Sequence, residues 1–254
     1  MIGRTLALLQ TNLLLANLVL TFRGLFRLPG FWVPTILFPA MLYAFFGAQT
    51  AGEGAQAVYA AASFAVYAVL GVAFFQFGVG IAEDRQSAFA VWQRSLPGGP
   101  APLWIARLCA ALVFSTAAVL LVLATAYLVA GLSLDPETQL RLLAVCLLLA
   151  VPATFMGTAL GYLTSGHSAV AIANLVFLPQ AYLGGLWVPP QSLPAEIETL
   201  SHWTPTRHMG EVAWAVVGAH PIPTASLFAL AAFTAGFIAL TWIAYHRDRR
   251  SRFS

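Results

Sequence analysis

Residues 142–195 decide the fold of this chain. They read LLAVCLLLAVPATFMGTALGYLTSGHSAVAIANLVFLPQAYLGGLWVPPQSLPA and contain no Asp, Glu, Lys or Arg. As a helix this run would extend roughly 80 Å at 1.5 Å per residue, whereas the hydrocarbon core of a bilayer is about 30 Å thick. The polar turn Thr-Ser-Gly-His-Ser at residues 164–168 divides the run into two halves. The stretch therefore predicts two successive membrane crossings.

The rest of the chain has the same apolar character. Of its 254 residues, 60% are hydrophobic and 8% are charged, whereas soluble domains carry about 25% charged residues. Four more charge-free runs each have room for one crossing: 28–52, 54–82, 108–134 and 212–246. The sequence thus predicts an all-α polytopic membrane protein with six transmembrane helices, near 31–50, 58–81, 103–128, 140–163, 169–187 and 224–245.

Residues 1–28 are predicted to form an amphipathic helix that lies in the membrane interface ahead of the six spans. Residues 5–22 lack charge, but they are diluted with amides and threonines and are framed by Arg4, Arg23 and Arg27. A crossing by this segment stays open as an alternative. A cleaved signal peptide fits less well, because no A-x-A-like cleavage site follows.

The arginines predict the orientation. Arg141 and Arg207 fall on one side of the predicted spans, and the other ten arginines fall on the opposite side. By the positive-inside rule the arginine-rich side is cytoplasmic. We therefore expect a multi-pass protein of the plasma (inner) membrane with both termini in the cytoplasm. Residues 1–254 form a single membrane domain, which includes an outer segment at 189–223 and a cytoplasmic tail at 246–254.

Several function classes are excluded by composition. Every basic residue is arginine, and a P-loop requires a lysine that contacts the β- and γ-phosphates of its nucleotide. The net charge of +3 comes from arginines beside apolar spans, so nucleic-acid binding is not expected. Cys109 and Cys146 lie inside apolar runs, which argues against a disulfide framework or a zinc site. No catalytic, metal or cofactor site is predicted in this chain.

A cytoplasmic loop at residues 83–102, here called the coupling loop, reads EDRQSAFAVWQRSLPGGPAP. Residues 87–96 can form a short helix that Leu-Pro-Gly-Gly-Pro then ends, because proline lacks a donor and glycine adopts unusual dihedrals. A short helix joined stiffly between two spans suits the transmission of force from a cytoplasmic partner. An interfacial loop helix without any partner is the alternative.

The outer segment, residues 189–223, is too apolar for a solvated loop and too short for two more crossings. Its six prolines keep any helix brief, so we expect two short helices near 195–203 and 206–217. Helices that dip into the outer leaflet must be covered by protein or face a cavity, so these re-entrant helices would form a lid with something beneath it. A simple interfacial hairpin is the alternative.

A few residues within the spans are candidates for lining a path. The polar ones could equally bond between helices, and the apolar ones could equally pack as ordinary core. The small-residue pattern Gly157-x-x-x-Gly161 permits close helix packing, either within the chain or across a dimer. The candidates for a substrate path are Met41, Tyr43, Gln76, Asn174, Phe177 and Gln180.

The chain resembles permease subunits of the type-2 ABC exporter family over nearly its full length. Three features support the resemblance: an N-terminal helix before six spans, the E-D-R…W-Q-R-S-L-P-G-G-P loop, and the outer stretch before the last span. That stretch runs from FLPQAYLGGLWVPPQSLPAE at 177–196 to WTPTRH at 203–208. It matches the family pattern of Gly-apolar-aromatic-x-Pro, Leu-Pro and Pro-Thr-x-His.

The resemblance implies a membrane unit of two permease subunits, identical or homologous, with two separate P-loop ATPase subunits beneath it that bind ATP and Mg²⁺. It also implies that the first, second and fifth spans border the substrate route. The residues expected to couple to the ATPases are Glu83, Asp84, Arg85, Phe89, Trp92 and Arg94. Those expected to form the outer gate are Gly184, Gly185, Pro189, Pro194, Pro205 and His208.

The predicted function is export of an amphipathic or lipid-like substrate or drug, driven by ATP hydrolysis in the separate ATPase subunits. A stand-alone channel or secondary transporter is the main alternative, although the spans almost lack the charges that ion coupling uses. An intramembrane enzyme acting through Glu83 and Asp84, and a purely structural role, are weaker alternatives. The transported substrate stays open.

Overall fold

The computed structural model describes residues 2–50, 54–87 and 101–251, and all secondary structure in these ranges is helical. The first half of the chain forms α1 (Ile2–Phe26), α2 (Pro29–Leu42), η1 (Tyr43–Gly47), α3 (Ala48–Thr50), α4 (Ala55–Val72), η2 (Ala73–Val79) and α5 (Gly80–Asp84). The second half forms α7 (Ala101–Ala130), α8 (Pro136–Leu163), α9 (Gly166–Leu183), η3 (Pro190–Ser192), α10 (Ala195–Ser201), α11 (Pro205–Val217) and α12 (Thr224–Ser251).

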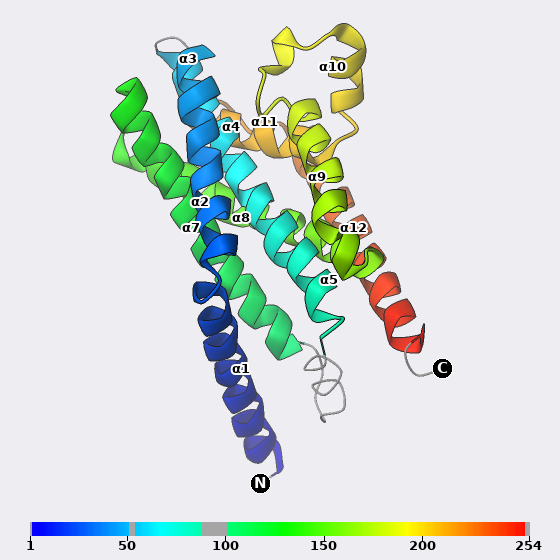
Figure 1. Ribbon diagram of the computed structural model, residues 1–254. Helices are drawn as coiled ribbons and strands as arrows, with labels where there is room; N and C mark the ends of the chain where they lie inside the picture. Colours follow the sequence, from blue (N-terminus) through cyan, green and yellow to red (C-terminus); the bar gives the residue numbers. More distant parts are fainter. Residues whose placement is uncertain (1, 51–53, 88–100, 252–254) are drawn as a thin grey trace.

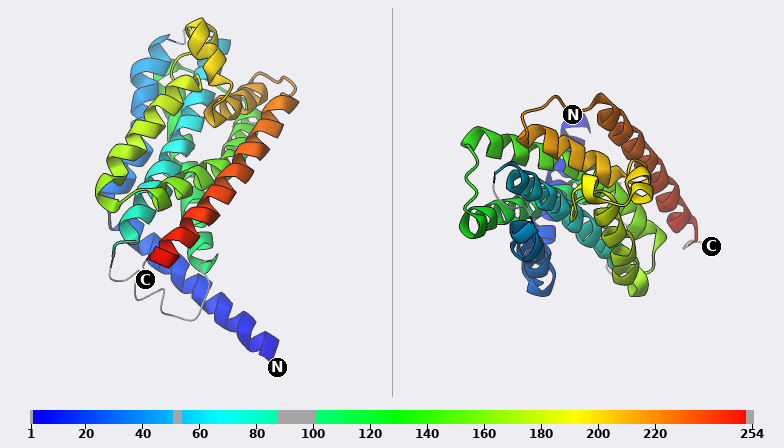
Figure 2. Two further views of the ribbon diagram at one scale, coloured as in Figure 1. Left: turned by 90° about the vertical axis from the view of Figure 1, so that its right-hand side faces the viewer. Right: turned by 90° about the horizontal axis from the view of Figure 1, so that it is seen from above.

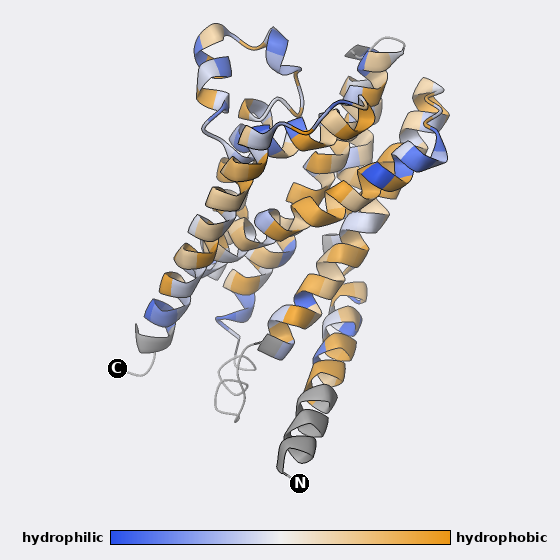
Figure 3. Ribbon diagram, turned by 180° about the vertical axis from the view of Figure 1, so that it is seen from behind, coloured by the Kyte–Doolittle hydropathy of each residue, from blue (hydrophilic) through white to orange (hydrophobic). Residues whose placement is uncertain are grey.

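Within the described residues, four helices are long and apolar enough to cross a membrane: 55–84, 102–130, 136–163 and 224–248. They agree in position and length with the predicted second, third, fourth and sixth spans. Apolar residues occupy the middle of the long helices and polar residues gather toward their ends (Figure 3). This distribution is the one that a bilayer imposes on helices that cross it.

The predicted first span is helical throughout, because α2, η1 and α3 follow one another from Pro29 to Thr50, but its apolar part, Trp32–Gly47, is shorter than the four long spans. The predicted fifth span is α9, which has 18 residues and ends at Leu183, so the predicted end at residue 187 is wrong. It ends early because Gly185 takes a left-handed φ of +74° and turns the chain. A count of six crossings therefore stays a prediction.

The helix from Ala55 to Asp84 lies at the centre of the molecule, with α2, α7, α8 and α11 around it (Figure 1 and Figure 2, right). Residues 61–73 are all buried. Its sequence explains this position, because AVYAAASFAVYAVLGVA alternates small alanines with aromatic rings and carries no charge on any side. The π-helical turns of η2 interrupt it at residues 73–79.

The pattern Gly157-x-x-x-Gly161 packs α8 directly onto η2 within the chain. A Cβ on Gly157 would lie 2.3 Å from the carbonyl oxygen of Ala73, and one on Gly161 would lie 2.7 Å from that of Gly78. Both distances are shorter than any real Cβ contact. The alternative role across a dimer is therefore not needed to explain this pattern, since the glycines are already used here.

The N-terminal helix α1 continues beyond the bundle from the start of α2 (Figure 2, left). Near its C-terminal end Phe26 packs on Phe114 of α7, with ring centroids 5.7 Å apart. Leu15, Leu20 and Phe26 are exposed, and the part-buried apolar residues lie between them in sequence. Over residues 13–26 the apolar side chains are thus spread around the helix instead of forming one face. A position in the membrane interface stays a prediction.

The two short helices predicted in the outer segment are present as α10 and α11. α11 begins at Thr204, whose hydroxyl accepts a hydrogen bond from the backbone N–H of Arg207 at 3.3 Å. Pro205 occupies the first helical position, where a missing N–H costs nothing. Trp214 then donates to the Ser63 hydroxyl at 2.8 Å and fixes α11 across α4.

Substituting Gly157 with alanine is expected to destabilise the protein by about 1–3 kcal/mol, because the new methyl group overpacks a backbone contact. Gly236→Ala is the matched control, since a Cβ there meets nothing within 4 Å and α12 continues through it. Thermal unfolding in lipid nanodiscs measures both. An equal effect of the two substitutions would contradict the close contact between α8 and η2.

Candidate functional site

Arg85 joins the ends of three helices at the end of the bundle where the coupling loop begins. Its Nη2 forms an ion pair with Asp248 near the end of α12; the Asp248 side chain is buried and that of Arg85 is mostly buried. Its Nη1 donates to the carbonyl oxygens of Gly161 at 2.7 Å and Thr164 at 3.4 Å, at the C-terminus of α8. The guanidinium also lies 5.3 Å from the centre of the Tyr162 ring. We call these five residues the Arg85 cluster.

The helix dipole adds to this arrangement. The last carbonyls of α8 have no partner within their own helix, and the C-terminus of a helix carries partial negative charge. A guanidinium with five N–H donors can satisfy such carbonyls and a carboxylate at the same time. The Arg85 cluster is therefore a rigid connection at the base of the second, fourth and last predicted spans.

Asp84 forms a second connection at the same end. It pairs with Arg107 of α7, whereas Glu83 is exposed. The prediction gave Glu83, Asp84 and Arg85 one common role in contacting an ATPase. The structure brings them together, but Arg85 is used inside the chain, whereas Glu83 and Asp84 are exposed. Three further predicted contact residues lie outside the described ranges: Phe89, Trp92 and Arg94.

A buried polar network, here called the outer network, connects α10, α11 and α12 at the opposite end. Arg207 donates from Nε to Glu211 at 2.8 Å and from Nη1 to the Ser201 hydroxyl at 3.2 Å. The Ser226 hydroxyl, at the start of α12, donates to the other carboxylate oxygen of Glu211. His208 lies against the same two groups, with Nδ1 3.3 Å from Ser226 Oγ and 3.4 Å from Glu211 Oε2.

His208 was predicted as a gate residue, and its second ring nitrogen fixes it to α10. Nε2 lies 3.0 Å from the carbonyl oxygen of His202, which can only accept, so Nε2 carries a proton and donates. The imidazole also packs against Phe233 of α12, with ring centroids 6.2 Å apart. His208 therefore belongs to the packing that holds the outer helices together.

The predicted gate glycines lie where the end of α9 meets the start of α11. Thr206 donates to the backbone carbonyl of Gln180 at 2.7 Å, and a Cβ on Gly184 would lie 2.5 Å from the Thr206 hydroxyl. Gly185, with positive φ, lies against Pro190. The structure thus gathers these predicted gate residues around one junction. Movement of this junction as a gate stays a prediction.

The remaining predicted gate residues are prolines that begin or precede short helices. Pro189 and Pro194 adopt extended backbone dihedrals immediately before η3 and α10, and Pro205 starts α11. They set the direction in which each short helix leaves its loop, because proline fixes φ near −65°.

The predicted path residues do not form one group. Tyr43 and Phe177 belong to a buried row of aromatic rings, with centroids of Tyr43 and Phe64 5.7 Å apart and those of Tyr67 and Phe177 4.8 Å apart. Gln76 is also buried, and neither end of its amide has a hydrogen-bond partner among the described residues. These three positions face the interior of a single chain.

The other three predicted path residues lie elsewhere. Met41 is on the outside of α2, with 49% of its surface exposed. Asn174 bonds the carbonyl of Val170 on its own helix, and Gln180 contacts Thr206 in the outer segment. A shared path for all six is therefore not present within one chain.

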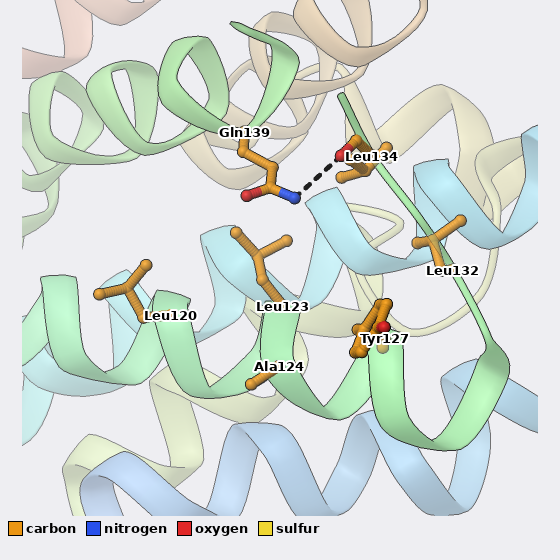
Figure 4. Close-up of a pocket in the computed structure, with 8 residues that line it drawn as sticks. Leu120, Leu123, Ala124, Tyr127, Leu132, Leu134 and Gln139 are labelled. Atoms are coloured by element: carbon orange, nitrogen blue, oxygen red, sulfur yellow. Dashed lines mark hydrogen bonds between the residues drawn. The ribbon is translucent and has the colours of Figure 1, made fainter. Parts of the chain in front are cut away.

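A cavity of about 280 Å³ opens near the far ends of α7 and α8 (Figure 4). Asp135 caps α8 there by accepting from the N–H of Thr138, and Gln139 donates to the carbonyl oxygen of Leu134 at 2.9 Å. None of the predicted path residues lines it. Its lining is Leu120, Leu123, Ala124, Ala126, Tyr127, Leu132, Leu134 and Gln139.

Sequence reasoning missed the partners of the predicted residues. Asp248 had one visible signal, because it is the only acid in the basic tail HRDRR at 246–250. Arg107 was counted only toward orientation, and Ser226 and Thr206 are ordinary residue types in apolar surroundings. Their roles depend on which helices meet, and no local pattern encodes that.

The stability that the outer network contributes depends on pH through the carboxyl group of Glu211. Burial alone would raise the pKa of this carboxyl, but hydrogen bonds from Ser226 and Arg207 and the arginine charge together lower it below its ordinary value of 4.5. A lowered pKa in the folded protein adds stability above pH 4.5 that is lost as the pH falls through the folded value.

We therefore expect Glu211→Gln to lower the melting temperature at pH 7 and to have progressively less effect as the pH falls below 4.5. Melting in nanodiscs across this range is the measurement. Glu137→Gln is the control, because Glu137 forms an exposed pair with Arg141 that adds little at any pH. A difference between parent and Glu211→Gln that is independent of pH would contradict the assignment.

Comparison with known proteins agrees with the architecture described above. The family described as ABC-2 type transporter matches residues 12–217, which is most of the chain. A curated relative from Bacillus subtilis (strain 168), named "Putative transport permease YvfS", is 21% identical over 210 residues, covering 81% of this chain and 86% of the relative. The chain belongs to the ABC-2 type transporter family and is a permease subunit, the non-catalytic membrane component of such a transporter.

Proposed function

We propose that this permease exports an amphipathic or lipid-like substrate or drug across the plasma membrane, driven by ATP hydrolysis in separate P-loop ATPase subunits. Two ATPase subunits dock at the cytoplasmic end, where they bind ATP and Mg²⁺. A second permease subunit, identical or homologous, completes the membrane unit. The first, second and fifth predicted spans border the substrate route, and α10 and α11 form its outer gate.

The observation that carries this proposal is the Arg85 cluster. Arg85 lies at the start of the coupling loop, next to the end of the second predicted span, and it is bonded to α8 and α12. A displacement of this loop is therefore transmitted to three helices at once instead of only bending the loop itself. The absence of lysine from the chain supports a motor in another subunit, since no P-loop can be assembled here.

The composition of the predicted spans supports the proposed class of substrate. They are rich in apolar and aromatic residues and contain few polar ones, among them Gln76, Asn174 and Gln180. A route bordered by such spans suits molecules with a large apolar part and weak polarity. Sugars, ions and other highly polar cargoes would need more polar groups than these spans provide.

The arrangement of the chain supports cytoplasmic termini. The beginning of α1, the end of α12 and the residues that flank the coupling loop all lie toward one end of the molecule (Figure 1). Arg141 and Arg207, the two arginines assigned to the outside, belong to α8 and α11. Both termini and the coupling loop would then face the ATPases from the same side.

Copurification from the native membrane in mild detergent tests the proposal. We expect a P-loop ATPase to accompany the tagged chain, and Arg94→Glu or Trp92→Ala to reduce its association or its stimulated ATPase activity about tenfold or more, since interface anchors of these types commonly contribute over 1.4 kcal/mol. Arg141→Glu is the matched control, because it reverses the same charge at an exposed position assigned to the outside.

Two outcomes would contradict the proposal. Recovery of the intact chain without any ATPase would remove the proposed motor. Substrate flux in proteoliposomes without nucleotide or partner would instead establish a stand-alone channel or secondary transporter.

A further inference from the structure

The last helix, α12, is attached to the rest of the chain by a polar contact at each end. At its cytoplasmic end Asp248 pairs with Arg85, and the two side chains are 7% and 14% exposed. At its outer end the Ser226 hydroxyl donates to Glu211 and lies 3.3 Å from His208. The two attachment points are roughly 33 Å apart at 1.5 Å per residue, which is about the thickness of the hydrocarbon core.

Between these points α12 is an uninterrupted helix whose inner side packs along α8, with the Tyr245 ring against Trp104 and Tyr162. It contains no proline, and Gly236 has open space around it. One narrow stripe faces the bundle, where Thr241 donates to the carbonyl oxygen of Phe155 at 3.4 Å. Leu227, Phe228 and Trp242 are exposed, and only 17% of its membrane-crossing window is buried. Such a helix can shift along its neighbours as a unit.

The outer attachment connects α12 to the proposed gate. Glu211 also bonds Arg207, and Arg207 bonds Ser201 of α10, so the start of α12 is joined to both outer helices. The inner attachment connects α12 to Arg85, at the start of the coupling loop. α12 thus contacts both the start of the coupling loop, where movement would begin, and the proposed outer gate, where it would have its effect.

We propose that α12 is the mechanical link between the coupling loop and the outer segment, and that Arg85 and Asp248 are the positioning residues that connect it to the loop. The inference rests on the proposed function, in which a separate ATPase moves the coupling loop. Nucleotide binding at the partner shifts Arg85, the ion pair moves α12, and Ser226 displaces the outer network.

A thiol at the outer end of α12 reports this movement directly. Ala225 is exposed and adjacent to Ser226, so Ala225→Cys provides the probe position. Cys109 is replaced by alanine to remove the partly exposed native thiol, while Cys146 is buried and stays. The copurified complex with its ATPase, in lipid nanodiscs, is treated with a membrane-impermeant maleimide with and without ATP and vanadate. Labelling of this chain is read by mass.

We expect ATP with vanadate to change the labelling rate at position 225 in the parent. Asp248→Asn is expected to reduce that change at least about fivefold, which is the lower end of usual coupling between two sites. Asp248→Glu should retain the response because it keeps the charge that Arg85 requires. Glu137→Gln, which removes an exposed ion pair on α8, should also leave it unchanged.

A nucleotide response in Asp248→Asn equal to that of the parent, with the ATPase bound and active, would overturn the link while the proposed function stands. Failure of the parent complex to bind an ATPase would overturn both, and an ATPase-bound parent without a nucleotide response at position 225 would overturn the link alone. If Asp248→Asn does not fold, Ser226→Ala tests the outer attachment, with the reporting thiol moved to Thr199, which is exposed on α10. The nucleotide response at position 199 should be lost in Ser226→Ala, and an unchanged response would overturn the link.

Discussion

The rest of this structure depends on how the guanidinium of Arg85 is paired. Arg85 is placed among helix ends where a cation without partners would cost several kcal/mol, and it is compensated there by Asp248 and by the last carbonyls of α8. Removal of one partner of such a pair typically costs about 3–5 kcal/mol, because the remaining charge stays buried. The second, fourth and last predicted spans must therefore end together at this point.

Farther from the Arg85 cluster, close contact between α8 and η2 makes the helix bundle rigid. Gly157 and Gly161 bring the backbone of α8 against η2 so closely that no side chain fits between them. Packed interiors of this kind do not deform continuously, and they change by shifts of whole elements. The outer helices are connected by the polar network and by the tight junction of Gly184 with Thr206, and α12 is less buried than the other three long helices. We therefore expect α12 to be the long helix that shifts most readily.

Hydropathy alone predicted the long spans, because in a bilayer the requirement for apolar length overrides most other preferences. Proline positions were sufficient to predict α10 and α11. The end of α9 was missed: Gly185 turns the chain, so that α9 ends at Leu183, four residues before the predicted end of the fifth span. The partner of Arg85 lies 163 residues away in sequence. Such pairings, like the outward position of Met41, are decided by which helices meet and could not be predicted from local pattern.

The most direct test of the account is a photo-crosslinking amino acid placed at Gln86, an exposed residue at the start of the coupling loop. Irradiation in the native membrane should produce one dominant adduct, a P-loop ATPase identified by mass spectrometry. The same amino acid at Thr199, exposed on α10 at the opposite end, should give no such adduct. An adduct with the ATPase from Thr199, or none from Gln86 in membranes that contain the intact transporter, would contradict the assignment of this end as the place where the motor acts.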